Sequence, residues 1–116
     1  MLVYILDRRC KDREQIAKWL REDKRINSVS LFDDYYTLFQ KITIESPNLC
    51  LIRAGDPVIP CFEAAKLIEK NNPNCKTIFL SDSKEYAVEA FEISLYGYLL
   101  LPGDKSKLYK IVFGDR

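Results

Sequence analysis

The sequence predicts an α/β protein, built as a three-layer α/β/α sandwich around a five-stranded parallel sheet. Five short apolar runs alternate along the chain with five stretches of helical periodicity. Parallel strands joined by right-handed helical crossovers are the simplest product of that pattern. The chain has 116 residues, 47% of them hydrophobic, which is enough for a single domain over residues 1–116 with its own core.

The first part of the chain predicts two strands and two helices. Residues 2–6 form a continuous apolar run, typical of a strand buried on both faces. Asp12 is predicted to cap the helix that follows. Residues 28–32 alternate polar and apolar side chains, as an edge strand does, and Asp33 or Asp34 is predicted to cap the second helix.

The third strand is predicted at residues 49–53, and Pro60 suits the first turn of the helix after it. Residues 76–80 are the fourth predicted strand. Ser83 is predicted to cap the fourth helix, with Phe91 facing the core.

The last strand is predicted at residues 97–102, and Asp104 is predicted to cap the last helix. The continuous apolar runs place the first, third and fourth strands in the centre of the sheet. The predicted order is therefore 2-1-3-4-5, as in flavodoxin-like folds. Ligands of such sheets bind outside the carboxyl ends of the strands, so Arg53, at one of these ends, is a candidate functional residue.

Composition and charge exclude several classes of protein. Lysine and arginine number 18 and aspartate and glutamate 17, with no histidine, so the bulk charge does not indicate binding to nucleic acid or to an anionic membrane. No apolar run approaches the roughly 20 residues that span a bilayer. The sequence also lacks a glycine-rich phosphate loop and a nucleophile paired with a base, so we expect no enzyme. The predicted location is the cytoplasm, with nucleic acid reached only through a separate domain.

Four cysteines are present, without a CxxC pair and without histidine to complete a zinc site. We therefore expect reduced, structural cysteines and no metal centre. They are Cys10, Cys50, Cys61 and Cys75.

Three segments together resemble a known family. Residues 72–81 (NPNCKTIFLS), 85–93 (EYAVEAFEI) and 98–102 (YLLLP) are similar in order and spacing to the receiver domain of response regulators, the CheY-like superfamily of two-component signalling and phosphorelay. The resemblance covers nearly the whole chain. It is strongest to receivers of LytTR-type transcription regulators, in which a receiver precedes a DNA-binding domain.

The resemblance implies a phosphoryl-transfer pocket at the carboxyl end of the sheet, and several of its parts are exchanged here. Such receivers use an acidic pair after the first strand, an acceptor aspartate after the third, a hydroxyl after the fourth and a lysine after the fifth, with Mg²⁺ between them. Asp7 stands in the acidic pair, but Arg8 is its neighbour. Arg53 occupies the acceptor position, Ser81 the hydroxyl position and Leu101 the lysine position.

This degenerate pocket predicts a pseudo-receiver. A guanidinium cannot carry an acyl phosphate, and one carboxylate beside two cations is not expected to hold Mg²⁺, so binding of that cofactor is expected to be lost. Arg53 is predicted to pair with Asp7. Asp56, in a Gly-Asp-Pro turn, is interpreted as a turn residue and not as a displaced acceptor.

The expected function is protein–protein interaction in bacterial signalling or transcription regulation. By the resemblance, Tyr98 matches the switch aromatic of receivers, and a homodimer is expected through the fourth helix, fifth strand and fifth helix. Two alternatives stay open. In one, Arg8, Arg53 and Ser81 bind an anion or a small metabolite. In the other, the chain is the N-terminal receiver of a longer LytTR-type DNA-binding regulator.

Overall fold

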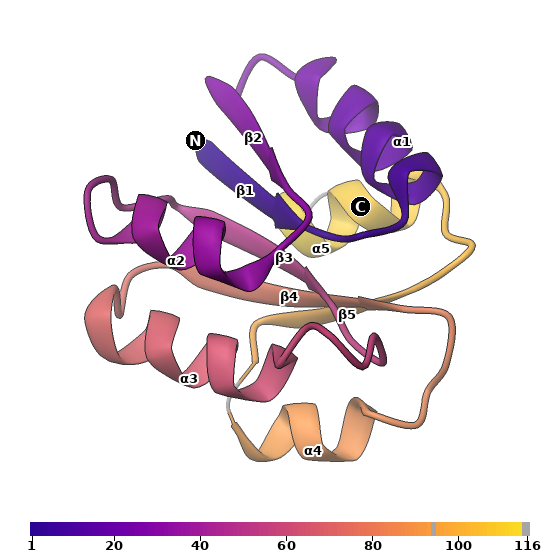
Figure 1. The fold of residues 1–116 in the computed structure, drawn as a ribbon. Coiled ribbons are helices and arrows are strands. Elements are labelled where there is room, and N and C mark those ends of the chain that lie inside the picture. The colour runs from indigo at the N-terminus through magenta and orange to yellow at the C-terminus, as the bar shows by residue number, and fades with distance from the viewer. Residues whose placement is uncertain (94, 115–116) are drawn as a thin grey trace.

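The structure, a computed structural model, describes residues 1–93 and 95–114 and has one parallel sheet of five strands in the order β2-β1-β3-β4-β5 (Figure 1). The predicted sandwich and strand order are confirmed. The strands are β1 (Leu2–Leu6), β2 (Ser28–Phe32), β3 (Leu49–Arg53), β4 (Lys76–Ser81) and β5 (Gly97–Leu100). The helices are α1 (Cys10–Arg21), α2 (Tyr35–Ile42), α3 (Cys61–Asn71), α4 (Ala87–Glu92) and α5 (Lys105–Phe113).

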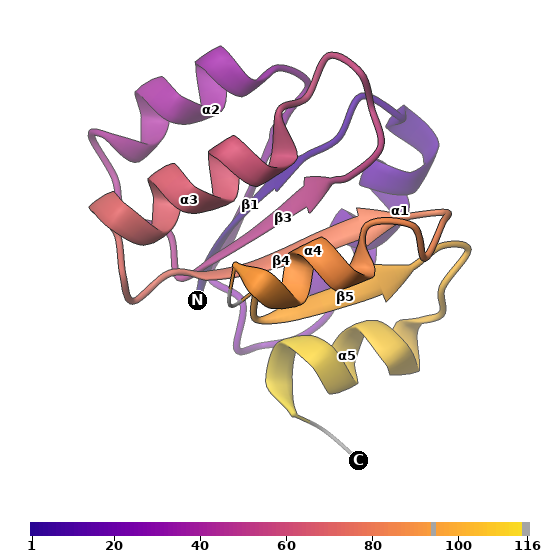
Figure 2. The same cartoon turned by 90° about the horizontal axis from the view of Figure 1, so that it is seen from below.

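The sheet is covered on both faces, by α1 and α5 on one side and by α2, α3 and α4 on the other (Figures 1 and 2). Side chains alternate between the faces because successive residues of a strand point in opposite directions. In β1, Val3 and Ile5 pack into the cluster that includes the α1 and α5 residues Ile16 and Leu108, whereas Tyr4 faces the opposite cluster. Two buried layers therefore fix the register of each strand.

The carboxyl ends of the central strands lie at one edge of the sheet. Leu6 pairs with Ile52, and Arg53 pairs with Leu80. The residues that follow, Asp7 in particular, therefore meet the end of β3 at this edge. None of the described helices is both long enough and apolar enough to cross a membrane.

Of the predicted helix caps, Asp34 and Asp104 are confirmed, whereas Asp12 and Ser83 are wrong. The Asp34 carboxylate accepts a hydrogen bond from the Thr37 amide at 2.8 Å, and Asp104 accepts one from the Lys107 amide at 2.7 Å. Asp12, in contrast, caps nothing. The first helix begins at Cys10, before Asp12, so Asp12 lies inside the first turn and its side chain is free to contact the end of the sheet.

The prediction for the fourth helix is wrong in its start and its inward face. Ser83 lies in a turn, where its Oγ accepts a hydrogen bond from the Glu85 amide at 3.1 Å, and α4 begins only at Ala87. Ala90 fills the core while Phe91 is 84% exposed. Neighbouring residues on a helix point about 100° apart, so only one of the two can face the sheet.

Candidate functional site

Arg53 lies at the centre of a buried ion-pair cluster at the carboxyl end of β3. Only 1% of it is exposed. Its Nε donates to Asp7 Oδ1 at 3.1 Å and its Nη2 donates to Asp7 Oδ2 at 2.8 Å. The same Nη2 donates to Asp12 Oδ2 at 2.6 Å. The predicted pairing of Arg53 with Asp7 is confirmed, and the structure adds a second carboxylate from α1.

Strand alternation explains why α1 supplies this second carboxylate. Arg53 follows Leu49 and Leu51 at intervals of two residues, and both leucines pack in the cluster beneath α1 and α5. The first turn of α1 starts at the same edge of the sheet. The sequence signal for this contact is an acidic residue five positions after Asp7, but an aspartate there is equally typical of a helix cap.

The two carboxylates hold the guanidinium in its charged form. Burial alone would lower the pKa of Arg53, but hydrogen bonds and charge from Asp7, and then from Asp12, outweigh burial and raise that pKa above its usual value. Asp7 Oδ1 also accepts the amide N–H of Arg9 at 3.0 Å. The third guanidinium nitrogen of Arg53, Nη1, is buried and has no hydrogen-bond partner among the described residues.

The residues present do not fit Mg²⁺. Asp7 and Asp12 converge as two metal ligands would, yet Nη2 of Arg53 lies between their carboxylates. Mg²⁺ requires close to octahedral coordination by oxygen, and a cation in the same place opposes it by charge and by volume. Over residues 1–93 and 95–114, no group of three or more His, Cys, Asp or Glu is arranged to hold a metal ion.

Two further arginines tie the loops around this cluster together. Arg8 in the β1–α1 loop pairs with Asp56 in the β3–α3 loop at 3.0 Å. Arg9 pairs with Asp82 in the β4–α4 loop at 2.8 Å, and its hydrogen bond and charge lower the pKa of the Asp82 carboxyl. Ion pairs thus connect three loops.

Among the described contacts, none links the side chains of Arg8, Arg53 and Ser81, the residues of the predicted anion site. Arg8 faces Asp56, and the guanidinium of Arg53 faces Asp7 and Asp12. Arg53 and its two carboxylates together have a formal charge of −1, which would repel a bound anionic ligand.

The residues on the β4–β5 side of the site are uncharged and engaged with the backbone. Ser81 is fully buried, and its Oγ accepts the Ser83 amide N–H at 3.1 Å. The Tyr98 hydroxyl donates to the Ser83 carbonyl. Leu101 follows the end of β5, donates its amide to the Ser81 carbonyl at 2.7 Å, and packs its side chain in the same cluster as Leu108.

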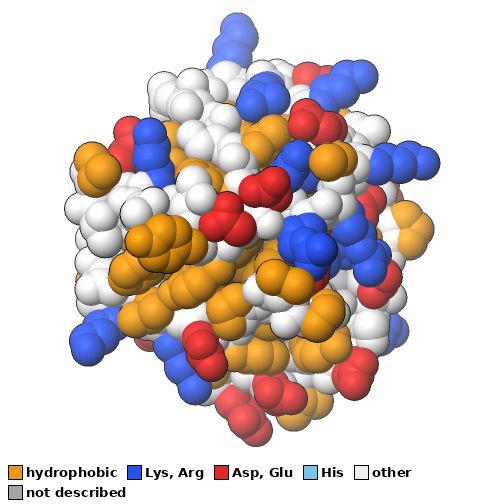
Figure 3. Space-filling model, viewed as in Figure 1, with side chains coloured by type: hydrophobic (Ala, Val, Ile, Leu, Met, Phe, Trp, Pro, Cys, Tyr) orange, Lys and Arg blue, Asp and Glu red, His pale blue; other side chains and the backbone are white. Residues whose placement is uncertain are grey.

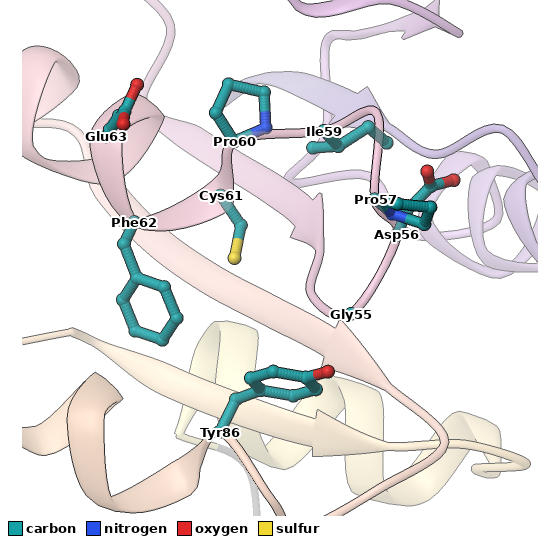
Figure 4. Close-up of a pocket in the computed structure, with 9 residues that line it drawn as sticks. All are labelled: Gly55, Asp56, Pro57, Ile59, Pro60, Cys61, Phe62, Glu63 and Tyr86. Carbon is teal, nitrogen blue, oxygen red and sulfur yellow. The ribbon is translucent and has the colours of Figure 1, made fainter.

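A groove of about 410 Å³ lies beside the ion-pair cluster and does not include Arg53, Asp7 or Ser81. Its walls are the β3–α3 loop, the start of α3 and the ring of Tyr86, with the sulfur of Cys61 directed toward that ring (Figure 4). Gly55 in this wall has φ of +88°, and a Cβ there would lie 2.9 Å from Cε2 of Tyr86. The positive φ favours glycine at this turn, and any larger residue would also have to displace the Tyr86 ring.

Comparison with known proteins identifies the architecture. No family model matches the chain. An uncharacterised response regulatory protein of Shewanella oneidensis is 30% identical over 108 residues, which is 91% of this chain but only 44% of that protein. The chain therefore spans less than half of this relative.

The fold is similar to that of solved structures of response regulators. The response regulatory domain of protein mrkE from Klebsiella pneumoniae superposes with a TM-score of 0.87 at 21% identity, covering 96% of this chain and 91% of that one. A DNA-binding response regulator of the LuxR family from Staphylococcus aureus superposes with a TM-score of 0.84 at 17% identity, covering 96% and 94%. The chain has the fold of CheY-like receiver domains, so the predicted resemblance to receivers is confirmed, whereas the closer likeness to LytTR-type receivers stays a prediction.

Proposed function

We propose that this domain is a pseudo-receiver of a bacterial two-component or transcription-regulatory system, which acts in the cytoplasm by protein–protein contact and not by phosphoryl transfer at position 53. The receiver fold and the similarity to a response regulatory protein support the signalling role. The observation that carries the pseudo-receiver proposal is the burial of Arg53 between Asp7 and Asp12 at the end of β3. A guanidinium there cannot accept a phosphoryl group as an aspartate does.

Acetyl phosphate labelling tests this proposal. The wild-type domain, incubated with acetyl phosphate and Mg²⁺, is expected to keep its intact mass. The triple variant Arg8→Asp/Arg53→Asp/Leu101→Lys restores the residue types of a working receiver, and it is expected to gain one phosphoryl group. Labelling of the wild type would overturn the proposal. A triple variant that folds by circular dichroism yet stays unlabelled would count against a receiver pocket at these positions.

A homodimer through α4, β5 and α5 is the proposed form of contact. This face exposes the apolar side chains Val88 (71%), Phe91 (84%) and Leu100 (38%). Acidic side chains gather over α4, at the lower edge of Figure 3, whereas α5 carries exposed lysines. Two-fold symmetry would place α4 of one copy against α5 of the other, so that unlike charges meet. The acidic residues are Glu85, Glu89 and Glu92, with Lys84 beside them, and the lysines are Lys107, Lys110 and Lys105, the last of which also pairs with Glu22.

Phe91→Glu tests the dimer, with Ile44→Glu as the matched control. Both wild-type side chains are 84% exposed, but Ile44 lies on the α2–β3 loop, away from the proposed interface. Light scattering is expected to show a dimer for the wild type and the control and a monomer for Phe91→Glu. A wild-type monomer at micromolar concentration would contradict the dimer.

The whole protein is proposed to be longer, with this receiver at its N-terminal side. Support comes from the relative that is more than twice as long as the aligned region, and from the similar fold of a DNA-binding response regulator. A LytTR-type DNA-binding domain is the proposed C-terminal partner. Sequencing the complete reading frame tests this, because a stop codon directly after Arg116 would contradict it.

One observation favours the alternative of an anion sensor, namely the buried Nη1 of Arg53 without a protein partner. A small oxyanion bound next to Arg53 would accept a hydrogen bond from Nη1. A thermal-shift titration with inorganic phosphate is the test. Saturable stabilisation of the wild type that is lost in Arg53→Met would favour this function over the first, and the absence of any shift would exclude phosphate as its ligand.

A further inference from the structure

We propose that Cys50 and Cys75 form a redox-active thiol pair that a peroxide oxidises reversibly to an intramolecular disulfide. Their Sγ atoms lie 3.8 Å apart, although the residues are 25 positions apart in the sequence. The sequence holds no CxxC motif that would indicate such a pair. Only the pairing of β3 with β4 brings the two thiols together.

The fold places both thiols on one face of the sheet, at the end opposite to Arg53. In the β3–β4 register Leu49 pairs with Lys76, so Cys75, one residue before β4, adjoins the first residues of β3. Cys50 is fully buried in the cluster beneath α2, α3 and α4, and Cys75 packs against the same cluster. A disulfide requires the sulfur atoms to approach to about 2 Å. Cys75 lies in the α3–β4 turn, where the backbone is less constrained than within the sheet.

The two thiols differ in access and in acidity, as an attacking and a resolving thiol must. Cys75 is partly exposed and lines an open groove of about 200 Å³, which admits a molecule as small as hydrogen peroxide. The hydrogen bond between the sulfurs lowers the pKa of Cys75. The same contact and burial raise the pKa of Cys50 well above its usual value. Cys75 is therefore the first nucleophile.

The chemistry is balanced by the peroxide alone. The Cys75 sulfur attacks one peroxide oxygen, the O–O bond breaks, and the other oxygen leaves as water with the thiol proton, giving a sulfenic acid. The Cys50 sulfur then attacks the sulfenic sulfur, and the S–O bond breaks as the S–S bond forms. The hydroxyl leaves as water with the Cys50 proton. Two thiols are oxidised by two electrons, and one peroxide is reduced to two waters.

The other two cysteines serve as internal controls. Cys10 is exposed and Cys61 is buried at the start of α3, and neither has a sulfur neighbour among the described contacts. Cys10→Ser removes the thiol most able to link two copies, and leaves three cysteines in the chain.

The test counts free thiols in Cys10→Ser before and after hydrogen peroxide. Alkylation under denaturing conditions followed by intact-mass measurement is expected to find three alkylated thiols before oxidation and one, Cys61, after it. A reductant is expected to restore all three. Peptide mapping is expected to show residue 50 linked to residue 75 within one chain.

Two variants distinguish a disulfide between Cys50 and Cys75 from non-specific oxidation of the cysteines. Cys61→Ser in the same background is expected to lose both remaining free thiols to the same disulfide, and Cys75→Ser is expected to form none. Three alkylated thiols after peroxide, a link through Cys61, or a link only between two copies would each overturn the proposal. Mapping of Cys10→Ser decides the question even if Cys75→Ser fails to fold.

Discussion

The carboxyl end of the sheet has two sides that differ in the charge of their side chains. On the β1–β3 side, Asp7, Asp12 and Arg53 form a buried cluster of full charges. On the β4–β5 side, Ser81 and Tyr98 keep the residue types of the receiver pattern, and both hydrogen-bond to the backbone of Ser83 in the loop after β4. The difference shows that a guanidinium joins the two carboxylates on the first side, whereas uncharged groups on the second side hold the loop after β4 in place.

The charged side should therefore contribute far more to stability than the uncharged side. Arg53→Met leaves Asp7 and Asp12 buried or half-buried without their cation, and loss of one partner of a buried ion pair costs about 3–5 kcal/mol. Urea unfolding measures this loss. Arg9→Met is the matched control, because Arg9 and Asp82 form an exposed, solvent-screened pair whose loss changes the free energy of unfolding little. Equal effects of the two substitutions would contradict the comparison.

Within the charged side, the two carboxylates are not equivalent. Asp7 has a fully buried side chain with two hydrogen bonds from Arg53, whereas the side chain of Asp12 is 36% exposed. Asp7→Asn is expected to lower the free energy of unfolding by about 3 kcal/mol, and Asp12→Asn by about 1 kcal/mol. Urea unfolding of both variants gives the order. A larger effect at Asp12 would show that α1, and not β1, supplies the main partner of Arg53.

On the uncharged side, Tyr98→Phe removes a single hydrogen bond to the Ser83 carbonyl. The expected loss is about 1 kcal/mol, the usual net contribution of one hydrogen bond. Amide hydrogen exchange should quicken in the β4–α4 turn and stay unchanged around Asp7. A loss as large as that of Arg53→Met would contradict the division into two sides.

The smallest expected effect is the pH dependence from the Arg9–Asp82 pair. Arg9 lowers the folded-state pKa of Asp82, so this pair stabilises the fold fully above the unfolded-state value of about 3.9. That contribution is lost as the pH falls through the lower folded-state pKa. Urea unfolding of the wild type and Asp82→Asn over acid pH should show a difference that shrinks as the pH falls. A difference that grows toward acid pH would show the opposite shift.

The fold followed from the sequence because its signals are local. Continuous apolar runs define β1, β3 and β4, and the alternating run in residues 28–32 defines the edge strand. The sequence misplaces the start of the fourth helix because Ser83 suits both a cap and a turn, and only packing against the sheet distinguishes them. Phe91 faces solvent, where the sequence predicts the core.

The site was only partly predictable because its contacts join residues distant in the sequence. The pair of Arg53 and Asp7 follows from two adjacent strand ends. The contact with Asp12 depends on where α1 begins, and the pairing of Arg8 with Asp56 depends on the course of the β3–α3 loop. The approach of Cys50 to Cys75 depends on strand register, which no local motif encodes.

We propose that Arg53 occupies the place that Mg²⁺ and a phosphoryl group would need in a working receiver. Titration of the wild-type domain with Mg²⁺ and beryllofluoride, followed by NMR of the backbone amides, tests it most directly. We expect no saturable shift at Asp7, Arg53 or Ser81, because the Asp7 carboxylate stays bound to the guanidinium. Saturable shifts at these amides, extending to Tyr98, would show a working receiver pocket and contradict the account.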